Sequence, residues 1–220
     1  DRNPSLNVDT VEMNNYSAGA IIAHYMIGLG HKHIAYISTT LNEANSARVR
    51  RLEGVRDTYR DECPEGSVIV RSREVTPKEE RDNISIVHPI SCAHYSISIE
   101  HAVGFELTRK CLGERRITAF VAVNDMVAYG VLDAIRAEGR RVPEDYSVCG
   151  FDNIFPSQFL PVGLTTVEHY IADKGRNAFE ILHSKMSGES SDRNITRVEF
   201  KHHLIVRDST AAPRGEEKTG

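Results

Sequence analysis

The sequence lacks the motifs that mark several classes of protein. Its four cysteines show no CxxC spacing and its ten histidines show no HExxH or paired His/Cys pattern, so neither a metal site nor a disulfide framework is indicated. It has no GxSxG motif and no glycine-rich loop that opens a helix, which argues against hydrolases and phosphate-binding loops. We therefore predict no metal, no cofactor and no enzymatic activity.

Long apolar runs and blocks of one charge are also missing. No run is long enough to span a membrane, and no secretory signal opens the chain, so we expect no membrane partner. The net charge of −4 and the scattered arginines and lysines make the chain itself a poor candidate for binding nucleic acid. Cysteines without a disulfide pattern fit reduced thiols, which predicts a cytoplasmic protein. A hydrophobic content of 40% is typical of a soluble globular chain.

The most informative segment covers residues 117–153 and reads as strand, helix, turn and strand. Ile117–Val123 is a short run of branched and aromatic residues, which suits a strand buried on both faces. Asp125 is positioned to cap the helix that follows, and Gly139 to end it. Ser147–Cys149 predicts the next buried strand, which ends at Gly-Phe-Asp-Asn.

Short strands and amphipathic helices alternate along the rest of the chain. The expected helices cover about 14–29, 45–61, 98–112 and 171–186, and the expected further strands cover Val8–Glu12, His33–Ser38, Ser67–Val70, Leu164–Val167 and Val198–Val206. The apolar residues of 73–97 follow neither the helix nor the strand periodicity clearly. This alternation predicts an α/β fold, with a Rossmann-like, mainly parallel sheet that carries helices on both faces.

Polar residues at the predicted strand tips form the candidate site. Asn124 and Asp152 each follow a buried strand, and ligands of open α/β sheets sit outside the carboxyl ends of the strands. Arg51, on a predicted helix, would add a forked donor for ligand hydroxyls. Two alternatives stay open at this point: Asp152 as a turn residue and Arg51 as a solvated surface charge.

An ordered set of motifs resembles the effector-binding domain of the lactose/galactose-repressor (LacI/GalR) family of bacterial transcription regulators. The matching segments are LGHKHIAYIS (29–38), RLEG (51–54), AVNDMVAYGVLDAI (122–135), GRRVPEDYSVCGFDN (139–153), LTTVEHYIADKGRNAFEIL (164–182) and VRDST (206–210). The resemblance implies a periplasmic-binding-protein-like fold of type I, in which two Rossmann-like lobes hold the ligand between them.

The resemblance also implies how this chain divides. Residues 14–168 would form the carboxyl-terminal lobe, and residues 1–13 with 169–200 would be a remnant of the amino-terminal lobe. Residues 201–210 would form the final strand and 211–220 a disordered tail. The family's DNA-binding headpiece and most of its amino-terminal lobe have no counterpart here, so one lobe would be complete and the other fragmentary. The apolar face of the helix over 171–186 would then lack a cover.

Several residue roles carry over from the family. Effector contacts are implied for Arg51, Asn124 and Asp152, and more weakly for Asp1, Ser46 and Ile99. Packing against a partner subunit is implied for Tyr129, Phe155 and Leu160.

The function implied by the resemblance is effector sensing in a transcriptional regulator. A small metabolite, a sugar or sugar derivative, would bind between the lobes and modulate operator binding by an intact homodimer. Operator DNA would be bound only through a headpiece absent from this chain. The alternative is a periplasmic sugar-binding protein that serves a transporter.

Overall fold

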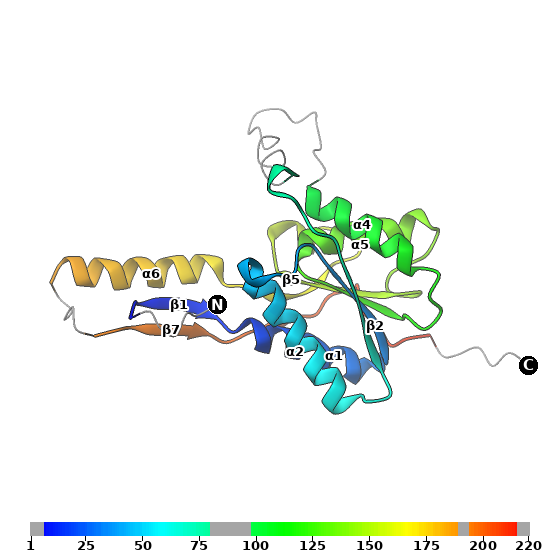
Figure 1. Ribbon diagram of the computed structural model, residues 1–220, viewed down its shortest axis with the longest axis horizontal. Coiled ribbons are helices and arrows are strands. Elements are labelled where there is room, and N and C mark those ends of the chain that lie inside the picture. Colours follow the sequence, from blue (N-terminus) through cyan, green and yellow to red (C-terminus); the bar gives the residue numbers. More distant parts are fainter. Residues whose placement is uncertain (1–6, 80–97, 189–193, 215–220) are drawn as a thin grey trace, which may run out of the picture.

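The computed structural model describes residues 7–79, 98–188 and 194–214, and its main element is a six-stranded sheet (Figure 1). The strand order is β3-β2-β4-β5-β6-β8; the first five strands are parallel, and β8 is antiparallel to β6. The strands are β2 (His33–Ser38), β3 (Ser67–Ser72), β4 (Ala119–Ala122), β5 (Ser147–Asp152), β6 (Thr165–Glu168) and β8 (Leu204–Ile205). The α/β class and the mainly parallel sheet predicted from the sequence are confirmed.

Two pairs of helices cover the two faces of this sheet. Helices α1 (Asn15–Leu29) and α2 (Ser46–Glu62) pack together on one face, and α4 (Ile99–Cys111) and α5 (Asp125–Ala137) pack together on the other (Figure 1). From β2 the chain continues to β3 on one side of the sheet, whereas from β4 it continues to β5 on the other side. The topological switch point therefore lies between the neighbouring strands β2 and β4. In such sheets ligands bind at the carboxyl ends of the strands beside the switch.

The core lies between the sheet and these helices. Tyr36, Phe120 and Phe151 are fully buried, as are most side chains of β2 and β4. Each helix pair comes together at glycines. A Cβ on Gly54 would lie 2.0 Å from the carbonyl oxygen of Tyr16, and one on Gly130 would lie 2.0 Å from that of His101. The contact therefore excludes any side chain at these two positions.

A smaller unit extends from the main sheet. Strands β1 (Thr10–Met13) and β7 (Arg197–Phe200) form a separate parallel pair, and α6 (Ile171–Met186) packs beside β1 (Figure 1). No residue of α6 is buried, and its apolar side chains at Ile171, Phe179, Leu182 and Met186 are exposed. The amphipathic helix is where the sequence pattern indicates, with its apolar face open among the described residues.

Three sequence-based predictions about local structure are wrong. The cap of α5 is Asn124, whose side-chain oxygen accepts from the backbone N–H of Val127 at 2.9 Å; Asp125 is instead buried in the first turn. The single strand expected over Val198–Val206 is two short strands in different sheets, because the segment at 201–203 crosses between them.

The third difference concerns the tail. The part of 211–220 that the structure describes is bound to the domain: the carbonyl of Ala211 accepts from the side chains of His31 and Ser147 at 2.9 Å, and Arg214 pairs with Asp145. These contacts fasten residues 211–214, which composition alone marks as disordered.

Candidate functional site

Polar side chains gather at the carboxyl ends of β4 and β5, beside the switch point. Asp152 is the last residue of β5, and Asn124 lies two residues beyond β4. Asp152 has a φ of 109° and Asn153 one of 48°, backbone conformations that residues other than glycine rarely adopt. Such strain persists where the surrounding structure imposes it, and it clusters at functional sites.

Arg51 reaches this edge from α2. Its Nη1 donates to the carbonyl of Val123 at 2.7 Å, and its Nη2 lies 3.4 Å from Oδ1 of Asp152. The guanidinium also lies over the ring of Phe151, 4.9 Å from its centroid, an arrangement in which the ring face attracts the cation. The Arg51 side chain is only 8% exposed, so the alternative of a solvated surface charge is wrong.

Asn124 uses both ends of its amide. While Oδ1 caps α5, Nδ2 donates to Oε1 of Glu100 at 2.9 Å. The same Glu100 oxygen accepts from Arg48 at 3.2 Å, and both of these side chains are about a quarter exposed. Glu100 and Arg48 therefore extend the site toward solvent. Sequence reasoning missed both, because residues 48, 100 and 124 meet only in the folded chain.

His169 joins the two central charges. Its Nε2 lies 2.8 Å from Nη2 of Arg51, and its Nδ1 lies 3.1 Å from Oδ1 of Asp152. It directly follows β6 and is one residue removed from α6, so it lies in a connection between the six-stranded sheet and the smaller unit. The family-like segment 164–182 contains this residue, but the sequence analysis gave it no role.

Burial dominates the protonation of the site. It raises the pKa of Asp152 from an ordinary 3.8 to about 7, although the neighbouring Arg51 guanidinium acts in the opposite direction. Burial, with the positive charge of Arg51 next in importance, lowers the pKa of His169 from 6.5 to about 3. Near neutral pH the site therefore combines the neutral imidazole of His169, the guanidinium of Arg51 and the carboxyl group of Asp152, which is ionised in only part of the molecules.

Asp125 forms a second buried network behind the strand tips. Its carboxylate accepts from the Thr166 and Ser157 hydroxyls, each at 2.6 Å, and from the backbone N–H of Ile154 at 3.0 Å. Burial raises its pKa to about 6 against these hydrogen bonds, which lower it. Asp125 thus secures the segment that follows Asp152 against the start of α5.

The remaining predicted site residues have different surroundings. Ser46 and Ile99 are the first residues of α2 and α4, at the same end of the sheet as Asn124, and both are partly buried. Asp1 lies outside the described residues.

The predicted subunit-contact residues lie close to a short 3-10 helix at Phe155–Gln158. The hydroxyl of Tyr129 lies 2.8 Å from that of Ser157, Leu160 is partly buried, and Phe155 is 75% exposed. Phe159, in the same predicted stretch between Phe155 and Leu160, is also exposed and lies against Phe155 with ring centroids 4.8 Å apart. These two rings form an exposed apolar pair.

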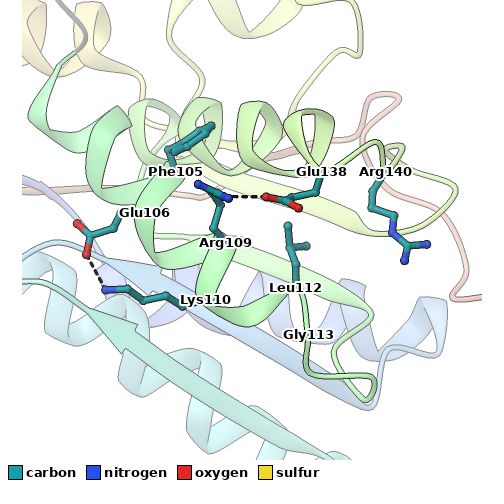
Figure 2. A pocket seen from close by; sticks show the side chains of 8 residues that line it. All are labelled: Phe105, Glu106, Arg109, Lys110, Leu112, Gly113, Glu138 and Arg140. Atoms are coloured by element: carbon teal, nitrogen blue, oxygen red, sulfur yellow. Dashed lines mark hydrogen bonds and ion pairs between the residues drawn. The ribbon is translucent and has the colours of Figure 1, made fainter.

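A surface hollow lies at the carboxyl-terminal ends of α4 and α5, away from the strand tips (Figure 2). Four of its charged lining residues form two ion pairs: Arg109 contacts Glu138 at 2.8 Å and Lys110 contacts Glu106 at 2.6 Å. It shares no residue with the strand tips. Across the described ranges, no group of three or more histidine, cysteine, aspartate or glutamate residues is placed to hold a metal, and no helix could span a membrane.

This sheet, with its polar strand tips beside the switch point and its smaller second unit, defines a domain of the periplasmic-binding-protein type. Residues 23–210 match the family model of the periplasmic binding protein-like domain. The chain therefore belongs to that family.

The relatives are bacterial transcription regulators of the LacI type. The transcriptional repressor PurR of Histophilus somni is 28% identical over 204 residues, which are 92% of this chain and 53% of the relative. The chain thus spans about half the length of the curated relatives it matches. A LacI-family regulatory protein from Corynebacterium glutamicum aligns with a TM-score of 0.72 at 26% identity, over 97% of this chain and 71% of its own.

A LacI-family regulator from Enterococcus faecium, solved with bound ribose, shares the fold. It aligns with a TM-score of 0.76 at 20% identity, over 97% of this chain and 69% of its own. Together these matches confirm the predicted family resemblance and fold.

Proposed function

We propose that this domain senses a small polyhydroxylated metabolite and so modulates operator binding by the bacterial regulator that contains it. The observation that carries the proposal is the convergence of Arg51, Asp152 and Asn124 on one edge of the sheet. Carboxylate, amide and guanidinium groups together supply both donors and acceptors, which is what sugar hydroxyls require.

The charges of the site favour a neutral ligand. Two carboxyl groups, Asp152 and Glu100, stand beside Arg51 and Arg48, so no single sign dominates. Among proteins of the same fold, structures are known with ribose, cellobiose and lactose. A sugar or sugar derivative is accordingly the effector class that we propose.

The proposal includes a division of the chain and a partner. Residues 14–168 would belong to one lobe, and residues 1–13 with 169–200 to the other, with Ser46, Ile99 and Asp1 also near the ligand. We further propose a homodimer that uses Tyr129, Phe155 and Leu160, supported by the exposed ring of Phe155. Operator contacts would belong to a headpiece outside this chain, and an operator-binding protein works in the cytoplasm.

A periplasmic sugar-binding protein is the second candidate, since it has the same fold. The relatives named as regulators favour sensing over transport, and over catalysis. The encoded sequence upstream of Asp1 separates the candidates: a helix-turn-helix supports the regulator, whereas a signal peptide supports transport.

Isothermal titration tests the proposed function. The chain is titrated with ribose, lactose, cellobiose, sugar phosphates and purines, and then as the Asp152→Ala variant. Loss of a charge-assisted hydrogen bond should weaken sugar binding by about 1.5–3 kcal/mol, or about ten- to a hundredfold. Asp173→Ala, on exposed α6, is the control and should bind like the wild type. A fall in Tm with unchanged affinity would assign Asp152 a turn role only.

A further inference from the structure

His169 has the contacts of a residue that organises the proposed site. Arg51 carries only donors, so its Nη2, at 2.8 Å, must donate to Nε2 of His169. A neutral imidazole that accepts at Nε2 carries its proton on Nδ1, which lies 3.1 Å from Oδ1 of Asp152. The hydrogen bond from Arg51 thus specifies one tautomer, and it excludes the imidazolium, whose Nε2–H would point at a second donor.

The same imidazole is held from several elements. Arg51 belongs to α2 and Asp152 to β5, and the nearby charges also include Lys174 of α6 and His202 of the segment between β7 and β8. After burial, Arg51, Lys174 and His202 each lower the pKa of His169. The His169 side chain is 14% exposed, so water screens these charges weakly.

Arg51 is also bound at the start of α1, where its Nε donates to Oδ1 of Asn15 at 3.0 Å. Its guanidinium therefore spans two of the connections that join the main sheet to the smaller unit, at Asn15 and at His169. Because Nε, Nη1 and Nη2 all have partners within the protein, the orientation of Arg51 depends on these contacts. His169 fixes the one that also touches Asp152.

We propose that His169 is a positioning residue of the effector site, whose Nδ1–H tautomer fixes the relative orientation of the Arg51 and Asp152 side chains. The inference rests on the proposed function. Both neighbours of Asp152 contact the same oxygen, Oδ1, so the imidazole orients the carboxyl group and leaves Oδ2 as the acceptor for a ligand hydroxyl. His169 acts through Asp152 and Arg51 and needs no contact of its own with the ligand.

The tautomer is measured first, without any ligand. Long-range ¹H–¹⁵N spectra of the ¹⁵N-labelled chain should show His169 protonated at Nδ1, with an unprotonated Nε2, and unchanged between about pH 5 and 8. His169→Gln identifies its signals by their loss. A proton on Nε2, or an ordinary titration near the value of a free histidine, would overturn the proposal.

Binding is measured second, with ribose, lactose and cellobiose as probes. His169→Ala should weaken the binding of whichever sugar the wild type binds by about five- to tenfold. His169→Gln should restore most of it, because the amide accepts from Arg51 and donates to Asp152 as the imidazole does. His24→Ala, an exposed histidine of α1, is the matched control.

The outcomes separate the positioning role from a structural one. Equal affinities in the alanine and wild-type chains would overturn the proposal, as would a loss that glutamine does not restore. Tm is recorded for each variant, since a merely structural histidine would change Tm and leave the affinity of the folded fraction unaltered. Wild-type protein that binds no probe would contradict the proposed function, whereas the spectra decide the arrangement of His169 independently.

Discussion

The pH dependence of unfolding tests the opposite shifts of Asp152 and His169. The folded-state pKa of Asp152 is raised from 3.8 to about 7, so its contribution to the free energy of unfolding falls as pH rises through this window. The folded-state pKa of His169 is lowered from 6.5 to about 3, so its contribution rises with pH over that range. Between about pH 4 and 6.5 the folded carboxyl group keeps a proton that the unfolded chain has lost, and the folded imidazole lacks one that the unfolded chain holds. The two contributions cancel in the wild type.

Single variants remove this cancellation. One proton of difference changes the free energy of unfolding by about 1.4 kcal/mol per pH unit, and partial exposure of Asp152 reduces the expected value to about 1 kcal/mol per unit. Relative to wild type, His169→Gln should lose stability by that slope as pH rises, because only the carboxyl contribution remains. Asp152→Asn should gain stability by a similar slope, because only the imidazole contribution remains.

Urea unfolding followed by circular dichroism at several values between about pH 4.5 and 6 gives these slopes directly. His24→Gln controls for loss of an exposed histidine. The differences from wild type are the measured quantity, so titrating groups that do not interact with Asp152 or His169 contribute equally to each pair. Parallel stability curves for all four proteins would refute the reasoning, since they would mean that neither pKa is shifted by folding.

Two further predictions concern packing and assembly. Gly54→Ala should destabilise the chain by about 2 kcal/mol or more in urea unfolding, because its Cβ would lie 2.0 Å from a backbone oxygen of α1. Gly28→Ala, with nothing within 4 Å, should instead stabilise by about 0.5–1 kcal/mol, and equal effects would contradict the close-contact argument. In sedimentation experiments, Phe155→Asp should dissociate the proposed homodimer and Phe179→Asp should leave it intact; the reverse result would place the interface on α6.

Local pattern was sufficient for most of the main sheet and for its strand tips. Ile117–Val123 and Ser147–Cys149 are apolar on both faces, as central parallel strands must be, and the helices between them have a clear period. Parallel strands bring their carboxyl ends to one edge, so the proximity of Asn124 and Asp152 followed from topology alone. Their roles in ligand binding remain predictions.

The missed residues show what local pattern does not contain. His169 meets Arg51 across 118 positions of sequence, and Glu100 meets Arg48 across 52. The choice between Asn124 and Asp125 as helix cap also depended on distant partners, since both residue types cap helices well. Asp125 is drawn into the core by hydroxyl groups on other elements, and this leaves Asn124 to accept from the first turn.

Helix α6 links the exposed surface to the site. Its amphipathic apolar face lacks a cover among the described residues, as the sequence predicts: Phe179 is 65% exposed and no residue of the helix is buried. Only Tyr170, which has a φ of 46°, separates α6 from His169. Because Arg51 and Asp152 contact that histidine directly, a displacement of α6 that moves His169 relative to the main sheet would either stretch these two contacts or carry the two side chains with it. Under the proposed function, a cover that shifts α6 would therefore change the geometry of the strand-tip site, and a ligand bound at the tips would act on α6 through the same contacts.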